Sequence, residues 1–325
     1  MPKSITIIGA GVAGLMCAQR LVESGLSVSI FDKSRGVGGR LASRRIENGV
    51  FNHGASEMAD FRTNTDLPQF AKKILEKAVS ENILIPNGST LTAYASMKTF
   101  TDHISRGIKI EKEAEIVSIK NQSPGIELLL KDTSAIQLNE NILIFAIPQP
   151  QVLNLLQNKF SAISDLIKPA KMYASISGLF AFDQSISRNS PNSENENIIA
   201  HHENSRIGQD LLLDCWTVHS KNTYGQHWID LDKDEIKDLL LNNLKELDLE
   251  NFTKPVYSAG HRWLYGFTEK SLNLDYIYND HHNIGICGDW CRGDTVIDAV
   301  ISGVSLAEKI LPFILNNKIL NNKEF

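Results

Sequence analysis

The first thirty residues show two short apolar runs on either side of a helical repeat. Residues 4–8 and residues 27–31 are mainly apolar, which predicts two buried strands. Residues 12–24 place apolar side chains at helical spacing, and Gly25 follows as a glycine that ends a helix. Because a strand, a helix and a second strand succeed one another within about thirty residues, this segment predicts a βαβ unit.

The rest of the chain alternates less regularly between helical and strand patterns. The patterns predict, in chain order, a helix at 68–80, a hairpin at 114–120 and 126–131, strands at 141–147 and 211–218, a helix at 232–247, a strand at 283–287 and a helix at 296–311. Residues 184–208 are the poorest in apolar side chains, and we expect a mobile loop there. This order predicts an α/β fold in which a substrate domain interrupts a dinucleotide-binding domain.

Composition and charge exclude several classes of protein. The 325 residues are 42% hydrophobic and 22% charged, and the net charge of −5 is spread along the chain, so we expect neither nucleic-acid nor membrane partners. Gln19, Arg20 and Glu23 interrupt the first apolar stretch before it reaches membrane-spanning length, and we expect a cytoplasmic protein. The four cysteines lack a second Cys/His pair at zinc spacing, so no metal site is predicted.

A glycine-rich turn joins the first predicted strand to the first predicted helix. Gly9, Gly11 and Gly14 have the G-x-G-x-x-G spacing, with Val12 and Ala13 between the last two. In such a turn the first glycine allows the tight bend, the second lets backbone N–H groups approach a pyrophosphate, and the third lets helix and strand pack closely. Asp32 follows the second strand, where its carboxylate can accept ribose hydroxyls. The alternative is a glycine turn that binds nothing.

A second glycine element favours FAD over NAD. Gly38, Gly39 and Arg40 follow Asp32 and Lys33. The two glycines let a second backbone segment come close to the cofactor, and the Arg40 guanidinium is suited to bind phosphate. A plain NAD dehydrogenase has no need for this element. A basic surface loop remains the alternative, because Arg35, Arg44 and Arg45 lie nearby in the sequence.

The C-terminal region supplies a further candidate cofactor element. Gly288 and Asp289 end a predicted strand, and the predicted helix that follows begins at Val296 and Ile297. We expect the Asp289 carboxylate to contact the cofactor, and the N-terminus of this helix to stabilise negative charge on a reduced flavin. A core helix with a polar approach is the alternative interpretation.

The blocks that carry chemistry occur in an order that resembles the renalase-like flavoproteins, within the FAD-dependent amine oxidases. The resemblance covers most of the chain. The matching blocks are residues 9–14, 31–41, 51–55, 146–151, 216–220, 261–263, 288–290 and 299–303. The sequence departs from the family after Ala55, where Ser56, Glu57 and Met58 stand in place of a glutamine and an aromatic pair.

This resemblance implies a fold and an activity. The expected fold is a Rossmann-like FAD-binding domain of the glutathione-reductase and p-hydroxybenzoate-hydroxylase type, made of residues 1–60, 111–155 and 270–325, with an inserted α+β substrate domain at 61–110 and 156–269. It implies non-covalent FAD, and Lys33, Gly54, Ala55 and Val117 complete the predicted cofactor-binding residues. It also implies hydride transfer from a small reduced substrate, such as an isomeric dihydronicotinamide dinucleotide or an amine, and reduction of molecular oxygen to hydrogen peroxide.

The candidate substrate side is an aromatic run near residue 263. Trp263 and Tyr265 can form a wall for a planar ring, and Arg262 can meet a carboxylate or phosphate. A core strand is the equal alternative, because aromatic residues favour strands. His53 and His219 are candidate catalytic residues or structural histidines.

Three functions therefore stay open from the sequence. The leading one is an oxygen-using flavin oxidase of the renalase type. The second is an amine oxidase or desaturase-like flavoprotein. The third is a flavin-binding protein without turnover, which the changed residues 56–58 keep open.

Overall fold

The computed structural model describes residues 5–122, 125–138, 142–188, 195–204 and 212–321. Its described strands include a six-stranded sheet in the order β19-β20-β12-β1-β2-β8, in which the neighbouring strands are parallel except for the antiparallel pair β19–β20. The bounds are β1 Ile5–Ile8, β2 Val28–Phe31, β8 Lys109–Glu111, β12 Ile142–Phe145, β19 Ile277–Asn279 and β20 Ile284–Ile286. The predicted strands at 4–8, 27–31, 141–147 and 283–287 therefore all lie in one sheet.

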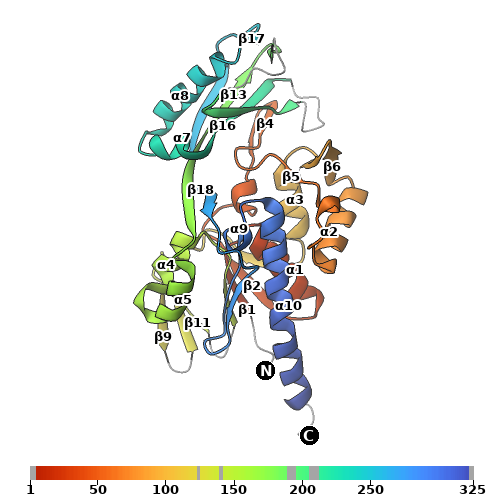
Figure 1. The fold of residues 1–325 in the computed structure, drawn as a ribbon, viewed down its shortest axis with the longest axis vertical. Coiled ribbons are helices and arrows are strands. Elements are labelled where there is room, and N and C mark those ends of the chain that lie inside the picture. Colours follow the sequence, from red (N-terminus) through yellow and green to blue (C-terminus); the bar gives the residue numbers. More distant parts are fainter. Residues whose placement is uncertain (1–4, 123–124, 139–141, 189–194, 205–211, 322–325) are drawn as a thin grey trace.

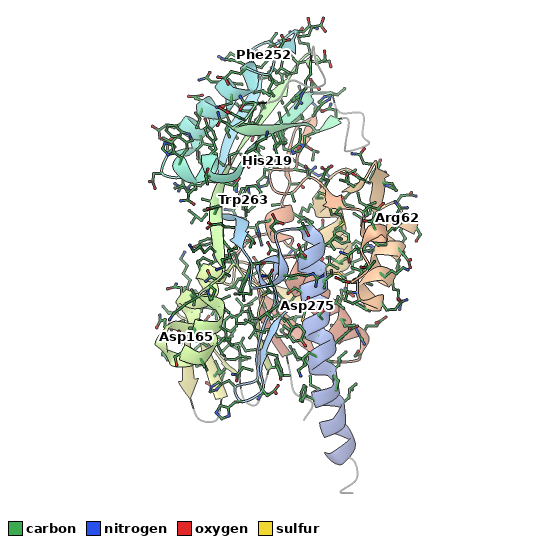
Figure 2. All side chains as sticks on the ribbon, viewed as in Figure 1. Arg62, Asp165, His219, Phe252, Trp263 and Asp275 are labelled. Carbon is green, nitrogen blue, oxygen red and sulfur yellow. The ribbon has the colours of Figure 1, made fainter. Side chains whose placement is uncertain are left out.

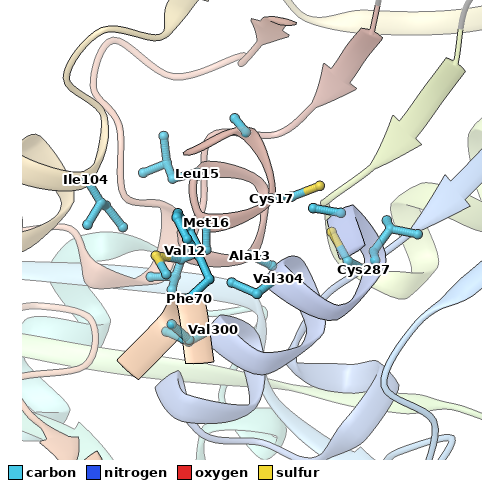
Figure 3. Close-up of a cluster of buried hydrophobic side chains, with 14 of the residues drawn as sticks. Val12, Ala13, Leu15, Met16, Cys17, Phe70, Ile104, Cys287, Val300 and Val304 are labelled. Carbon is cyan, nitrogen blue, oxygen red and sulfur yellow. The ribbon is translucent and has the colours of Figure 1, made fainter. Parts of the chain in front are cut away.

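Two helices pack together beside this sheet. α1 (Val12–Glu23) connects β1 to β2, and α10 (Val296–Asn321) follows the last strand. Val12, Ala13 and Met16 of α1 lie in one buried cluster with Val300 and Val304 of α10 (Figure 3). The two backbones approach closely because Gly303 has no side chain, and a Cβ at this position would lie 2.1 Å from the Ala13 carbonyl oxygen.

The segment between β2 and β8 packs on the same two helices. It contains η1 Gly39–Leu41, β5 Met58–Ala59, η2 Phe61–Thr63, α2 Gln69–Ser80, β6 Leu84–Asn87, β7 Thr90–Ala93 and α3 Met97–Ile104. We predicted that residues 61–110 lie in the substrate domain. In the structure, Phe70, Leu75 and Phe100 share the buried cluster of α1 and α10, and β8 is the edge strand of the nucleotide-type sheet. The division into domains stays a prediction.

A second buried cluster covers the other side of the six-stranded sheet. The antiparallel strands β9 Ile116–Gln122, β10 Gly125–Leu130 and β11 Ala135–Leu138 form the predicted hairpin and one further strand. α4 Gln149–Leu156, η3 Gln157–Phe160 and α5 Ser161–Ile167 pack beside them. In this second cluster, Ile163 and Ile167 pack with Phe145 of the nucleotide-type sheet.

The upper part of the molecule is a sheet whose described strands follow the antiparallel order β15-β16-β13-β18 (Figure 1). Its strands are β13 Lys171–Phe182, β15 Ile198–His202, β16 Asp214–Ser220 and β18 Tyr257–Lys270, with α7 Asn222–His227, α8 Lys233–Lys245 and the short pair β14 Ser187–Arg188 and β17 Leu249–Glu250 around them. α8 covers one face through Ile236, Leu240 and Leu244. The predicted loop at 184–208 is wrong at β15, which pairs with β16 along its whole length.

We call the part of the molecule that contains the six-stranded sheet the lower layer. The face of the upper sheet that α8 does not cover points toward it. The hairpin β3 Arg44–Ile46 and β4 Gly49–Phe51 reaches up to this face, and Phe51 packs against Leu179, Ala181 and Cys215. At the other end of the chain, α9 Asp289–Arg292 follows β20. Within the described residues, no helix is long and apolar enough to cross a membrane.

The close contact at Gly303 makes a stability prediction. Gly303→Ala places a Cβ against the Ala13 carbonyl oxygen, and we expect a loss of about 1–3 kcal/mol in the free energy of unfolding, measured by urea titration. Gly36→Ala is the matched control, because its Cβ would meet only the Lys98 Cε at 3.8 Å. Equal stability of the two variants would contradict this packing.

Candidate functional site

In the first glycine turn, one glycine has free space where a Cβ would lie, and the other two have backbone atoms there. Gly9 has φ +108°, and a Cβ on it would lie 2.4 Å from the Ala146 carbonyl oxygen. A Cβ on Gly14 would lie 2.1 Å from the Gly9 carbonyl oxygen. Gly11, which precedes α1, has nothing within 4 Å of a Cβ. The turn therefore presents bare backbone at Gly11 and packs tightly on both sides of it.

The second glycine element lies directly against the first. The Gly38 N–H donates to the Ala10 carbonyl at 2.8 Å, and Gly11 and Gly38 form a parallel bridge. Gly39 has φ +54°, and a Cβ there would lie 3.3 Å from the Gly11 Cα. Two turns that are far apart in sequence thus join into one continuous backbone surface, which is the kind of cradle that a pyrophosphate requires.

Asp32 helps to hold the turn in place. One carboxylate oxygen accepts a hydrogen bond from the Ala10 N–H at 2.6 Å, and the other accepts from the Ser34 N–H at 2.8 Å. A carboxylate has about four acceptor sites, so these two bonds leave capacity for a ribose hydroxyl. The ribose contact of Asp32 stays a prediction, and the Lys33 side chain is exposed beside it.

Arg40 and Asp289 connect the second glycine element to the C-terminal block. Arg40 Nη2 forms an ion pair with Asp289 Oδ1, and the Asp289 side chain is only 6% exposed. Thr268 Oγ1 donates to the other Asp289 oxygen at 3.3 Å, and Arg40 Nη1 donates to the Gly266 carbonyl at 3.4 Å. The structure thus brings together Arg40 and Asp289, which are 249 residues apart in the sequence.

The backbone around Arg40 is also fixed by the block at residues 53–55. The Ala55 N–H donates to the Arg40 carbonyl at 2.8 Å, and a Cβ on Gly54 would lie 1.9 Å from the same oxygen. On the far side, the Gly288 N–H donates to Ser302 Oγ at 2.9 Å. Gly54, Ala55 and Gly288 therefore position the Arg40–Asp289 pair.

Three other predicted cofactor residues differ in how far their side chains are exposed. Val117 is 39% exposed and lies where the pairing of β9 with β10 shifts register, so it is left out of the ladder. The Ile297 side chain is 4% exposed in the α1–α10 cluster, and Val296 packs against the same cluster. The side chains of Val296 and Ile297 therefore contribute to the core, whereas that of Val117 is exposed.

A cluster of aromatic rings lies on the face of the upper sheet opposite α8. We define the histidine–tryptophan cluster as His53, His219, His261 and Trp263. Ser177 of β13 lies opposite His219 on β16 and opposite His261 on β18, and Ser175 lies opposite Trp263. Trp263 and His219 lie where the upper sheet meets the lower layer (Figure 2).

His53 sits at the centre of this cluster. Its ring stacks on Trp263 with 5.5 Å between centroids and meets His261 edge-on at 4.7 Å. Its carbonyl accepts from Trp263 Nε1 at 2.8 Å and from Ser177 Oγ at 3.2 Å. His53 is 8% exposed, and in the described part of the chain its buried Nδ1 has no hydrogen-bond partner. A buried nitrogen without such a partner is costly, because its desolvation is not compensated.

His53 and His261 are neutral at physiological pH. Burial, together with the charges of His261, Arg44 and His219, lowers the pKa of His53 to about 3. Burial, with Arg44 and Lys233, lowers the pKa of His261 to about 4. A neutral imidazole with so low a pKa offers a hydrogen bond but accepts a proton poorly at pH 7.

The predicted aromatic run is only partly brought to this cluster. Trp263 joins it, but Arg262 is exposed and donates to the Ile229 carbonyl at 3.0 Å, because neighbouring residues of a strand point to opposite faces. Arg262 therefore lies on the strand face opposite His261 and Trp263, and its anion contact stays a prediction. Tyr265 is half-buried in the register shift that separates the pairs Ser175–Trp263 and Tyr173–Phe267.

The changed residues 56–58 turn away from the cluster. Met58 is 2% exposed, pairs with Leu91 of β7 and packs in the α1–α10 cluster. The Ser56 carbonyl accepts from Thr92 Oγ1 at 3.3 Å, and Glu57 accepts from Thr90 Oγ1 at 3.1 Å. These contacts belong to the small sheet of β5, β6 and β7.

Sequence reasoning missed several residues of the site. His261, Ser177 and the buried Glu203 received no role, although Glu203 accepts from the Asn52 N–H at 3.0 Å and so holds the segment before His53. The alternation of His261 and Trp263 along one strand face was a usable signal. No sequence signal marked Glu203, because this residue lies inside the predicted loop. Among the described residues, no group of three or more His, Cys, Asp or Glu could hold a metal ion.

Comparison with known proteins first defines the class of the N-terminal part. A family model described as an NAD(P)-binding Rossmann-like domain matches residues 7–74, the part of the chain with both glycine turns. The chain therefore carries a Rossmann-like nucleotide-binding domain, and the predicted α/β fold class is confirmed.

Two named proteins show more particular similarity. The chain is 27% identical over 110 residues to 4,4'-diaponeurosporene oxygenase from Staphylococcus aureus strains MRSA252 and USA300, and this match covers 32% of the chain but 22% of the relatives. A solved structure from Exiguobacterium sp. 255-15, provisionally named protoporphyrinogen oxidase, superposes with a TM-score of 0.67 over 95% of this chain and 99% of that one. At 13% identity this likeness shows a shared fold.

The open position at Gly11 predicts a selective loss of binding. Gly11→Val fills the cradle, and we expect the affinity for FAD to fall by about tenfold or more, which corresponds to about 1.4 kcal/mol. The unfolding midpoint of the apoprotein should hardly change, because nothing lies within 4 Å of the new Cβ. Flavin titration and thermal unfolding measure the two effects. Stoichiometric flavin in the variant would refute the site.

The neutral histidines predict how stability depends on pH. The folded-state pKa values of about 3 and about 4 lie below the ordinary 6.5, so the unfolded chain binds more protons in this range. The stabilising contribution is fully present above pH 6.5 and is lost as the pH falls toward 4 and then 3. Urea midpoints between about pH 4.5 and 7.5 should therefore fall less steeply in His53→Phe and His261→Phe than in the wild type. The exposed His281→Phe is the control, and identical slopes in all proteins would contradict the assignment.

Proposed function

We propose that the protein is an FAD-dependent oxidase of the renalase type, which takes a hydride from a small reduced substrate and reduces molecular oxygen to hydrogen peroxide. The observation that carries this proposal is the convergence of three parts. The bare backbone of Gly11 and Gly39, the Arg40–Asp289 pair and the histidine–tryptophan cluster follow one another through direct contacts. A dinucleotide cradle beside a dry aromatic wall suits a two-electron oxidation.

The residues of the lower layer fit FAD. The backbone at Gly11 and Gly39 would hold the pyrophosphate, and Asp32 would take the adenosine ribose. Arg40 adds positive charge, and the buried Asp289 offers acceptor oxygens to hydroxyl groups beyond the pyrophosphate. When bound, FAD supplies the hydride acceptor that the chain's own side chains lack.

The residues of the upper sheet favour a donor that needs no general base. His53 and His261 are neutral but too weakly basic to take a proton from an ammonium group at pH 7. Arg44 adds positive charge near both rings, which disfavours a cationic amine. A dihydropyridine such as an isomeric dihydronicotinamide nucleotide transfers a hydride without prior deprotonation, and the half-buried Trp263 ring, backed by His53, offers it a planar surface.

A second candidate reaction is supported by the similarity to 4,4'-diaponeurosporene oxygenase. That relative is named as an oxygenase, and an amine oxidase-like or desaturase-like flavoprotein is the alternative for this chain. The third hypothesis, flavin binding without turnover, depended on residues 56–58. Their packing into the small sheet removes them from the cluster and weakens that hypothesis.

Anaerobic mixing of the purified yellow protein with candidate donors tests the proposal. We expect dihydronicotinamide isomers to bleach the flavin absorption and amines to leave it unchanged, and oxygen should then restore the colour with formation of peroxide. The rate of bleaching should be flat between about pH 5.5 and 8, because the two histidines do not titrate there. Bleaching by amines alone, or by none of these donors, would overturn the proposed substrate.

A further inference from the structure

Glu203 is a buried acidic residue to which the proposed reaction gives no part. It directly follows β15, its N–H donates to the Cys215 carbonyl of β16 at 2.8 Å, and the residue is fully buried. Its Oε1 accepts from Thr217 Oγ1, which also lies on β16. Because a buried carboxyl group is costly without such partners, these contacts fix the Glu203 side chain on the upper sheet.

Asn52 joins this side chain to the lower layer. The Asn52 N–H donates to Glu203 Oε1 at 3.0 Å, and Asn52 Nδ2 donates to Glu203 Oε2 at 3.1 Å. At the other end of the amide, Oδ1 accepts from the Met97 N–H at 2.9 Å and from Ser43 Oγ at 2.8 Å. Met97 begins α3 and is buried in the α1–α10 cluster. Since the Met97 N–H can only donate, it also fixes which end of the Asn52 amide is the oxygen.

The Glu203–Asn52 pair lies directly before His53 in the chain. The His53 carbonyl accepts from Trp263 Nε1 at 2.8 Å. Because peptide groups are planar, only the φ and ψ angles of residues 52 and 53 separate this carbonyl from the Asn52 N–H that Glu203 holds. On the other side of His53, the backbone at residues 54–55 packs against the second glycine element. The His53 backbone is therefore held from both sides.

We propose that Glu203 is a positioning residue, which acts through Asn52 to set the His53 backbone and thereby the placement of the Trp263 ring. This role rests on the proposed function, because it concerns hydride transfer only if Trp263 forms the surface for the donor. A carboxyl group suits the role, because its two oxygens accept the two neighbouring N–H donors of Asn52 together. A misplacement of about 1 Å at a reacting centre can slow a reaction by about 100-fold.

Exchanging the amide and the carboxylate tests the proposal. Glu203→Gln brings a second amide nitrogen against Asn52 Nδ2, so that two donors face each other. Asn52→Asp brings two carboxylates side by side. When both substitutions are combined, the new amide donates to the new carboxylate, and the bonds of the Asn52 N–H, the Met97 N–H and Ser43 keep suitable acceptors. The net charge of the pair is then the same as in the wild type.

Two readouts apply to the full-length protein loaded with FAD. The first is the nitrogen–proton NMR signal of the Trp263 indole, which reports its bond to the His53 carbonyl and is assigned with Trp263→Phe. The second is the limiting rate of flavin bleaching at a saturating dihydronicotinamide isomer. Each single variant should shift the signal and lower the rate about tenfold or more. The double variant should return the signal to its wild-type position and the rate to within about threefold.

Asn243→Asp is the matched control, because it changes another buried amide that donates hydrogen bonds. Asn243 Nδ2 donates to the Leu239 carbonyl at 2.9 Å and to the Tyr224 hydroxyl at 3.1 Å, within and beside α8. This variant should unfold at a lower temperature, because both bonds are lost. It should leave the Trp263 signal and the bleaching rate unchanged, and adding Glu203→Gln should give no rescue.

The double variant also decides the case in which the single variants do not fold. A folded double variant with the wild-type Trp263 signal then supports the proposal, and an unfolded one refutes it. A Trp263 signal that stays in place in both single variants, or a double variant no closer to the wild type than they are, would also refute it. If no donor bleaches the wild type, the proposed function fails, while the Trp263 signal still decides whether Glu203 positions this ring.

Discussion

The structure depends on backbone segments that approach one another where no side chain intervenes. Gly14 meets the Gly9 carbonyl, Gly54 meets the Arg40 carbonyl and Gly303 meets the Ala13 carbonyl, each at a distance that excludes a Cβ. These contacts press α1 against β1 and α10 against α1, and they bring residues 53–55 onto Arg40. The same closeness leaves Gly11 as bare backbone with open space beside it. The close backbone packing around the turn therefore leaves the backbone at Gly11 accessible.

The cradle and the aromatic wall are joined through charge. Asp289 is buried, and a buried carboxylate is costly unless it is paired and hydrogen-bonded. Arg40 and Thr268 satisfy it, and Arg40 also reaches the Gly266 carbonyl in the irregular part of β18. Trp263 of the same strand donates to the His53 carbonyl. One ion pair thus links the nucleotide-type layer to the strand that carries the candidate substrate wall.

The elements that sequence reasoning predicted well are the local ones. The βαβ unit, both glycine turns and the helix that begins after Asp232 follow from short-range patterns, and the last has a complete capping box with Glu235. The packing of residues 61–110 on α1 and α10 was not predictable, because it rests on contacts between distant segments. The strand β15 was not predicted, because the residues around it are polar and favour a loop. Arg262 alternates with His261 and Trp263 along the strand, and this pattern already assigns it to the other face of the sheet.

The central claim is that the cradle at Gly11 and Gly39 is built for FAD in particular, although a Rossmann-like domain alone also suits NAD. Equilibrium titration of the apoprotein with FAD, FMN and NADH tests it most directly. The account predicts tight, stoichiometric binding of FAD and much weaker binding of FMN, which lacks the adenosine and the pyrophosphate, and of NADH. Binding of NADH or FMN as tight as that of FAD would contradict it.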